Sequence, residues 1–489
     1  MSATVSQAQA QTISPGCGMT APEPSAVQVD ASCRPLLLLF VSAAAWLLAA
    51  SVIGLIASLK FHSPNILAGC PVLTYGRVRP AALDAFLYGF ALQAGMGVLI
   101  WINCHLGRAR LAVAPLLTAG WFFWNIGVTF GVLGIFAGDN TGYEWLEMPR
   151  YGSAPLFFGY AAIGIAALIS FHFRSRRELY TSQWFLLAAL FWFPWIYTTA
   201  RALLTIWPVR GTMQSVVDWW YINNLTAVCF GFVGLGAAFY FVPKIVNRPL
   251  YSHYLGIFIF WTLALFGSWG FAPIAAPVPA WIPALSTLAA LLTIVPMLAV
   301  AINVLHTLCG RDQSTKGNVT LSFVLFGAAA FVIAGLLNAV CSLANVSEIT
   351  AFTWFDPARV QIFLFGFFAM TIFGAIYYII PRLVPAGSLS PGLIRLHFWL
   401  GALGIILFAG PLLIGGLKQG SDLNNAGLPF LNVVQGTLGF LRASTTGELL
   451  ILLGNAILVL NIVAMLVRVG RASATAAWAA NSRKAEVAS

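Results

Sequence analysis

Six histidines are the residues of this chain best suited to hold a transition metal or a haem iron, because imidazole is the usual protein ligand for both. They are His62, His105, His172, His253, His306 and His397. None is followed by a second histidine two, three or four positions later, so no helix face presents a histidine pair. We expect each of them at a helix end or in a loop, as a polar anchor rather than as a metal ligand.

The sulfur side chains are the next candidates for metal chemistry. The chain has seven cysteines, with no C-x-x-C-H sequence for an attached haem and no zinc spacing. Cys229 and Met370 lie in apolar segments and are the remaining candidates for an unusual ligand, although buried sulfur usually packs in a core. The sequence therefore predicts no metal site and no disulfide framework.

Charged residues are rare in the apolar segments, and those present lie near one end of each segment. An ionisable group inside a membrane is costly, so each is a functional candidate. We interpret them as a network of arginines and carboxylates that joins helix ends at the outer surface. The alternative is an anion site, such as haem propionates require. The predicted network comprises Arg77, Arg79, Asp84, Asp356, Arg359, Arg442 and Glu448.

The composition shows which kind of element must position these residues. The chain is 60% hydrophobic and 8% charged, whereas a soluble protein carries about a quarter charged residues. Apolar runs recur that are long enough to cross a bilayer as helices. The fold class predicted is therefore all-α, a polytopic membrane protein with twelve transmembrane helices. They are expected near 35–59, 81–106, 111–137, 153–173, 181–207, 218–243, 253–275, 281–307, 318–343, 357–381, 393–416 and 445–468.

Three domains follow from this pattern. Residues 1–34 read as a disordered tail, 35–470 as the twelve-helix domain and 471–489 as a basic C-terminal tail. The net charge of +11 reflects lysines and arginines in short loops, which set topology, so the lipid bilayer rather than nucleic acid is the expected partner. If both termini are cytoplasmic, most of these basic residues lie in segments on the cytoplasmic side of the membrane.

One span carries an unusual pair of amides. The segment Trp219–Tyr254 begins WWYINN, which places Asn223 and Asn224 near the start of an apolar helix, where both need partners. This segment resembles span 6 of the catalytic subunit I of haem-copper oxidases, and within that family the cbb3-type. The strings LTYGRVRP at 73–80, GAIYYIIPRL at 374–383 and HFWLGALG at 397–404 resemble the family in the same order.

The resemblance implies haem b and copper, but the ligands that it requires are absent at the matching positions. The two low-spin haem ligand positions fall on Ala82 and Gln361, the high-spin haem ligand position on Arg359, and one copper ligand position on Asn223. The remaining copper pair belongs just after Trp269, in a stretch with no histidine. Alanine and arginine offer no lone pair to a metal, and a lone amide is a poor copper ligand. We therefore expect no haem, no copper and no catalytic residue.

Loss of the cofactors also leaves volume to be filled. We expect aromatic side chains of span 10 to occupy the former haem volumes. The candidates are Phe363, Phe365, Phe367, Phe368 and Phe373.

Three functions remain open at this point. The first is a degenerate, haem-free and copper-free subunit I-like protein of the bacterial inner membrane. It would be a structural or accessory subunit beside c-type cytochromes or a catalytic subunit I. The second is an active oxidase or nitric oxide reductase with unusual ligation, and the third is a transporter or ion conduit on the same scaffold.

Overall fold

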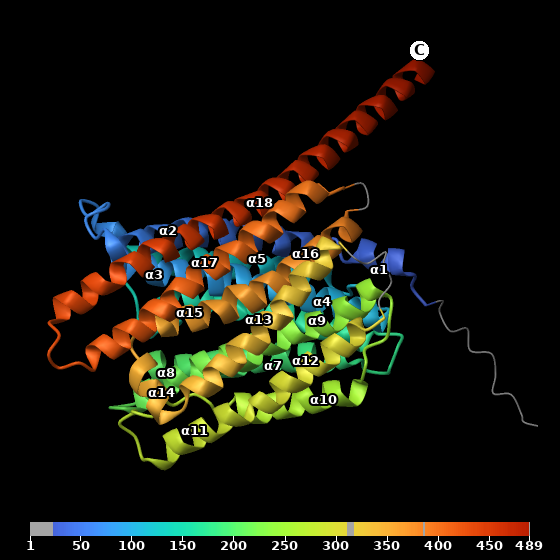
Figure 1. Ribbon diagram of the computed structural model, residues 1–489. Coiled ribbons are helices and arrows are strands. Elements are labelled where there is room, and N and C mark those ends of the chain that lie inside the picture. The colour runs from blue at the N-terminus through green and yellow to red at the C-terminus, as the bar shows by residue number, and fades with distance from the viewer. Residues whose placement is uncertain (1–22, 311–316, 385–386, 489) are drawn as a thin grey trace, which may run out of the picture.

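The computed structural model describes residues 23–310, 317–384 and 387–488, and the side chains up to residue 475. Residues 1–22 of the predicted N-terminal tail lie outside this description. The described chain forms a bundle of long helices that run roughly side by side, and the last helix extends well beyond the rest (Figure 1). The all-α membrane fold is confirmed.

Each of the twelve predicted spans coincides with a helix, and eleven of these helices are long and apolar enough to cross a membrane. Several spans join two helices through a π-helical or bent segment, and the bounds are as follows. The spans are α2 (Leu36–His62), α3–η2–α4 (Tyr75–Asp84, Ala85–Leu92, Gln93–Gly107), α5 (Ala114–Ala137), α6 (Arg150–His172), α7–η3 (Thr181–Arg201, Ala202–Ile206), α8–η4–α9 (Met213–Asn223, Asn224–Phe230, Gly231–Val246), α10–η5 (His253–Thr262, Leu263–Gly267), α11–α12 (Trp281–Leu292, Ile294–Leu308), α13 (Val319–Cys341), α15–η7–α16 (Phe355–Gln361, Ile362–Ala369, Met370–Leu383), α17 (Pro391–Leu423) and α18 (Phe430–Ala488).

The seventh span is shorter than predicted. It ends at Gly267 instead of near residue 275, and its helix is too short to meet the length of a full span. The segment that follows, 268–280, contains Gly270 and three prolines, which cannot continue a helix. Because this segment is not helical, its side chains can cover one end of the bundle.

Short elements complete the fold. They are α1 (Ala26–Ser32), the 3₁₀ turn η1 (Pro71–Leu73) and α14 (Ala344–Thr350). Local capping sets several helix starts: the Ser252 side chain accepts a hydrogen bond from the Leu255 amide, and Asn318 does the same for Leu321. We call the end of the bundle near α14, where segments 138–149, 268–280 and 351–354 lie, the α14 end.

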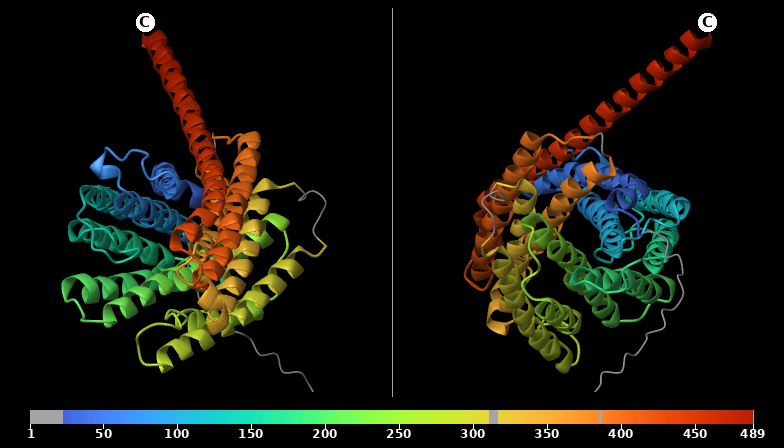
Figure 2. Two further views of the ribbon diagram at one scale, coloured as in Figure 1. Left: turned by 60° about the vertical axis from the view of Figure 1, so that its left-hand side comes forward. Right: turned by 90° about the vertical axis from the view of Figure 1, so that its right-hand side faces the viewer.

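Both predicted tails differ in part from the structure. Residues 26–32 form α1, in which Val29 is buried and Asp30 accepts a 3.1 Å hydrogen bond from the Trp101 indole. Helix α18 continues through the predicted C-terminal tail to Ala488, and its last turns project from the bundle (Figure 2). The alanines of this tail explain the helix, because alanine has the highest helix propensity.

Three spans form the centre of the bundle. Their most apolar windows are 94% (Tyr75–Gly107), 89% (Met213–Val246) and 83% (Phe355–Leu383) buried within the protein, whereas the other spans reach at most 50%. The remaining helices surround them, and α18 packs against α2 so that the last span closes on the first. The three central spans are those that carry Ala82, Asn223, Arg359 and Gln361.

Candidate functional site

The central spans enclose a cavity of about 690 Å³ towards the α14 end. All four predicted former ligand positions, Ala82, Asn223, Arg359 and Gln361, line it. This volume lies within the range of pockets that hold a cofactor-sized ligand. The structure therefore brings together in one space the residues that the sequence places far apart.

π-helical segments occur at each of these positions. Ala82 lies three residues before η2, Asn223 immediately precedes η4, and Gln361 immediately precedes η7. The seventh span also ends in a π-helical segment, η5, directly before the stretch that would carry the copper pair. π-bulges cost regular hydrogen bonding and are frequent at functional sites. A π-helical segment therefore begins within three residues of each of the four predicted positions, which themselves lie in α-helical segments.

The phenylalanines expected to fill the former haem volumes leave the cavity of about 690 Å³ open. Of the five candidates only Phe365 lines the cavity. Phe367 packs on Phe331 with ring centroids 4.7 Å apart, and Phe368 packs on Phe230 at 4.6 Å. Phe367 and Phe368 belong to the π-helical η7, and their rings pack in the core of the bundle instead of facing the cavity. The aromatic character of this span therefore reflects helix packing.

The two adjacent amides have different roles. Asn223 lines the cavity and donates a 2.7 Å hydrogen bond to the Gly267 carbonyl. Asn224 is fully buried: it accepts from the Trp192 indole at 3.1 Å and donates to the carbonyls of Trp220 and Ser268. The amide pair therefore ties the sixth span to the fifth and to the end of the seventh.

This difference predicts unequal costs of truncation. Asn224→Ala leaves the Trp192 donor and two carbonyls without their partner, so we expect a loss of roughly 2 kcal/mol or more of stability. Asn223→Ala leaves only the Gly267 carbonyl, next to a cavity that can hold water, so it should cost under about 1 kcal/mol. Thermal unfolding of the two variants in detergent measures both. Equal losses would contradict the assignment of separate roles.

The predicted charge network forms only in part. Arg359 pairs with Asp356 at 3.1 Å and also donates to the Asn338 side chain. Arg77 donates to the Phe136 carbonyl at 3.0 Å, and Arg442 is exposed, outside the cavity. Neither forms an ion pair within the described part of the chain. The single network predicted from the sequence is therefore wrong.

Asp84 and Glu448 do not serve as partners of these arginines. Asp84 lies two helical turns, about 10 Å, beyond Arg77 on the same helix, which is too far for an ion pair. It is fully buried and faces Glu147 and Arg201 instead. Glu448 lines the cavity, six residues from Arg442 and therefore on a different face of α18.

A second polar cluster, which the sequence did not reveal as a unit, surrounds Asp84. Arg201 donates a 2.8 Å hydrogen bond to the Met148 carbonyl and lies over the Tyr197 ring. The hydroxyl of Tyr88 is 2.7 Å from that of Tyr221. Burial, and then the adjacent Asp84 carboxyl, raise the pKa of Glu147 well above its usual range. No signal in the sequence indicated the burial of the loop residue Glu147, because no periodicity places a loop side chain in a core.

The raised pKa of Glu147 predicts a pH-dependent stability. In the folded protein Glu147 keeps its proton, whereas in the unfolded protein it loses this proton above the usual pKa of a glutamate. The free energy of unfolding should therefore fall as pH rises from that usual value towards the pKa of Glu147 in the folded protein. Glu147→Gln removes this proton and should flatten the dependence between about pH 6 and 9. The unfolding temperature of both proteins across this range measures the effect. An unchanged slope would contradict the protonated state of Glu147.

His397 is the one histidine that departs from the expected interfacial role. It is fully buried, its Nδ1 lies 2.8 Å from the Tyr377 hydroxyl, and Asn455 lies beside it. Its ring packs between Phe323 and Phe373, behind the cavity wall rather than in the cavity. The prediction of a helix-end anchor is wrong for this residue, because two turns of helix separate it from the start of α17.

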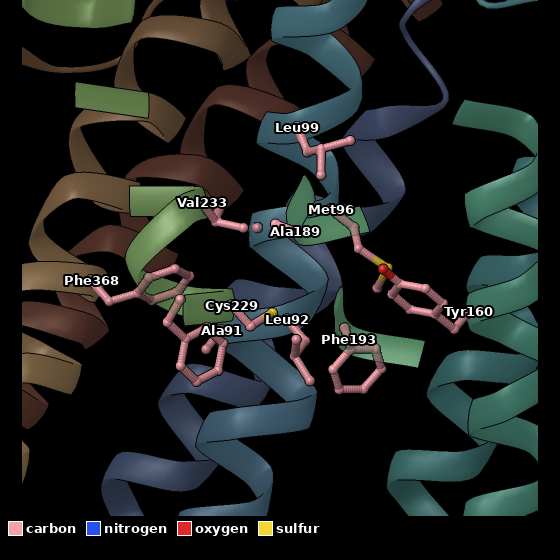
Figure 3. A pocket seen from close by; sticks show the side chains of 12 residues that line it. Ala91, Leu92, Met96, Leu99, Tyr160, Ala189, Phe193, Cys229, Val233 and Phe368 are labelled. Carbon is pink, nitrogen blue, oxygen red and sulfur yellow. The ribbon is translucent and has the colours of Figure 1, made fainter. Parts of the chain in front are cut away.

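Neither sulfur candidate reaches the cavity. Cys229 borders a separate small cavity of about 20 Å³ together with Met96, Tyr160 and Phe368 (Figure 3). Met370 packs against Gly401. The positions of both side chains are those of core residues.

The cavity residues do not fit haem or copper. Among the described residues that line it, none is histidine, cysteine, methionine or tyrosine. Haem iron requires an axial ligand of one of these types, and copper in such a site requires imidazole or sulfur. The nitrogens of Arg359 offer no lone pair, and the amides of Asn223 and Gln361 are weak ligands. No reaction step at a metal can therefore be assigned to these residues.

Comparison with known proteins agrees with this architecture. The profile of the family "Cytochrome C and Quinol oxidase polypeptide I" matches residues 34–450. A cytochrome c oxidase subunit 1 homolog of Agrobacterium tumefaciens (strain T37) is 25% identical over 393 residues, covering 76% of this chain and 71% of that protein. The cbb3-type cytochrome c oxidase subunit CcoN1 of Stutzerimonas stutzeri is 23% identical over 434 residues, covering 84% of this chain and 89% of that protein.

The fold has a counterpart of known structure. A solved structure of a heme-copper terminal oxidase dimer superposes with a TM-score of 0.68 at 16% identity, covering 88% of this chain and 84% of that one. This likeness concerns the fold alone, whereas the family profile covers most of the chain. The chain belongs to the haem-copper oxidase subunit I family.

Proposed function

We propose that this chain is a degenerate, haem-free and copper-free member of the family that serves as a structural or accessory subunit of a respiratory complex. One observation carries the proposal: all four former ligand positions line one cavity, and none of them bears a side chain that can hold the metal. The backbone keeps the shape of a cofactor site while its side chains have lost the chemistry. The relatives named cytochrome c oxidase subunit 1 and CcoN1 supply the respiratory context.

The same proposal names the partners and the location. The chain would reside in a bacterial inner membrane with both termini cytoplasmic, beside c-type cytochromes or a catalytic subunit I. Its lipid-facing helices would provide the contact, since at least half of the residues in the apolar window of each peripheral span are not buried within the protein. An inactive subunit of this kind contributes contacts and space rather than electron transfer.

An affinity purification of the full chain from its native membrane in mild detergent tests the accessory role. We expect haem-bearing subunits to co-purify in a fixed ratio, and a peroxidase-activity stain and mass spectrometry identify them. A control bait is an unrelated polytopic membrane protein with the same tag. Recovery of this chain alone, without a haem-bearing partner, would contradict the accessory role.

An active oxidase with unusual ligation is the alternative, and it needs ligands from outside the family's set. Cys229, Met370 and His397 are the buried candidates, and none of them lines the cavity. Cys229 and Met370 lie on central spans and His397 lies on α17, so ligation by any of them would require its helix to turn another face to the cavity. The degenerate subunit is therefore the function that we favour.

A further inference from the structure

The cavity carries an uneven set of charges. Of the described residues that line it, two are cationic, Arg79 and Arg359, and three are acidic, Glu144, Asp356 and Glu448. Arg359 is paired with Asp356. Arg79 and Glu144 are exposed and form no ion pair in the described chain. Glu448 is the buried carboxylate among these lining residues.

Glu448 lies between α2 and α18 in a setting that is neutral but partly polar, since Ser51 and Ser58 line the same cavity. Its side chain is 9% exposed, and the carboxylate lies against Gly54 of α2, where even a Cβ atom would come within 2.9 Å of Oε1. Phe408 and Ile451 line the same part of the cavity, and no described side chain forms an ion pair with Glu448. An ionised carboxylate in such a setting is unfavourable, so Glu448 either keeps its proton or is joined by a counter-ion.

A second polar group lies on the same wall. Asn455 lies seven residues after Glu448 on α18, two turns further along, and also lines the cavity. Its amide nitrogen donates a 2.8 Å hydrogen bond to Ser51, and its oxygen lies beside the buried ring of His397, which can serve as its donor. Asn455 is therefore held within the protein, and Glu448 is the group of this wall that a cation would meet.

The aromatic lining of the cavity suits a cation of apolar character. The rings of Phe61 and Trp354 lie 4.6 Å apart edge to face, and Phe86, Phe365 and Phe408 are among the other aromatic residues that line the cavity. Aromatic faces attract cations, and the attraction is strongest where water is excluded. The anionic propionates of a haem, by contrast, would meet a cavity whose net charge is already negative.

We propose that this cavity binds a hydrophobic organic cation, a lipophilic amine or quaternary ammonium, with Glu448 as its counter-ion and Asn455 beside it. This proposal rests on the proposed function, because a haem in the cavity would occupy the same space. The ligand class follows from the buried carboxylate, which forms no ion pair in the described chain, and from the aromatic lining. Binding would give this carboxylate a counter-ion.

Equilibrium dialysis of the purified full chain in detergent micelles tests the proposal with two probes of the same shape and opposite charge. Tetraphenylphosphonium should bind saturably at one site per chain, and tetraphenylborate should show only unsaturable partition into micelles. Glu448→Gln should weaken tetraphenylphosphonium binding at least about tenfold, and Glu448→Asp should retain it, since the charge remains. Glu348→Gln changes an exposed glutamate outside the cavity and should leave binding unchanged.

Saturable binding of tetraphenylborate, or equal affinity of the wild type and Glu448→Gln for tetraphenylphosphonium, would overturn the proposal. A haem assay of the same wild-type sample separates this result from the proposed function. A haem-free protein that fails to bind the cation contradicts the cation site alone. A protein that contains stoichiometric haem contradicts the proposed function.

Discussion

A variant with histidines at positions 82 and 361, Ala82→His/Gln361→His, should acquire about one haem b per chain, whereas the wild type should hold almost none. Both positions line the 690 Å³ cavity from opposite central spans, one before η2 and the other before η7. The space and the adjacent π-helical segments are already in place, so the ligands are what the site lacks. Two imidazoles would give a six-coordinate, low-spin iron with a sharp reduced spectrum.

Single variants provide the matched controls for this gain. Ala82→His and Gln361→His alone should hold haem more weakly, because each leaves one side of the iron without a strong ligand. Adding Glu448→Gln to the double variant should raise the haem content further, since it removes the buried carboxylate of the cavity. A stable, monodisperse double variant without haem would show that the cavity has lost its shape as well as its ligands.

Gly447→Val should abolish recovery of folded protein. A Cβ atom at Gly447 would lie 2.3 Å from the Phe408 amide nitrogen and 2.7 Å from the Gly404 carbonyl oxygen, both of them backbone atoms. No side-chain movement can relieve such contacts, so α17 and α18 must separate, at a cost above the roughly 1–3 kcal/mol of ordinary overpacking. Because α18 also packs on α2, the cavity wall that carries Glu448 would open.

Gly439→Val is the control for this substitution. It lies on the same helix, and no atom lies within 4 Å of its Cβ position in the described structure. The two variants therefore share the intrinsic cost of valine in a helix and differ only in packing. Size-exclusion chromatography and thermal unfolding in detergent compare them. Similar recovery of the two variants would contradict the close approach of α17 and α18.

Much of the fold follows directly from hydrophobicity. Apolar runs of membrane length set all twelve spans, but the bounds of two are misjudged. The seventh span ends at Gly267, before a stretch with three prolines, and the last helix begins at Phe430 instead of near residue 445. The assembly of the former ligand positions in one site was also predictable, since the family's order of spans sets which helices meet. His397 was misjudged because distance from a helix end says little about burial in a bundle.

The contents of the site were less predictable. A sequence pattern does not predict where a cavity remains. It could not show that Phe367 and Phe368 pack into the core while the cavity stays open. The same applies to charges: the partners of Asp84 come from a loop and from another span, which spacing along its own helix cannot show. Sequence indicates which side chains are costly to bury, and the structure shows which of them are left without a partner.

A pyridine haemochrome assay with copper analysis on the purified wild-type chain tests the central claim most directly. The cavity residues predict well under about 0.1 haem and 0.1 copper per chain, even when the protein is produced in cells that supply both. Protein determined by amino-acid analysis provides the denominator, and an active subunit I purified in parallel provides the positive control. One haem b per chain in the wild type would contradict the account.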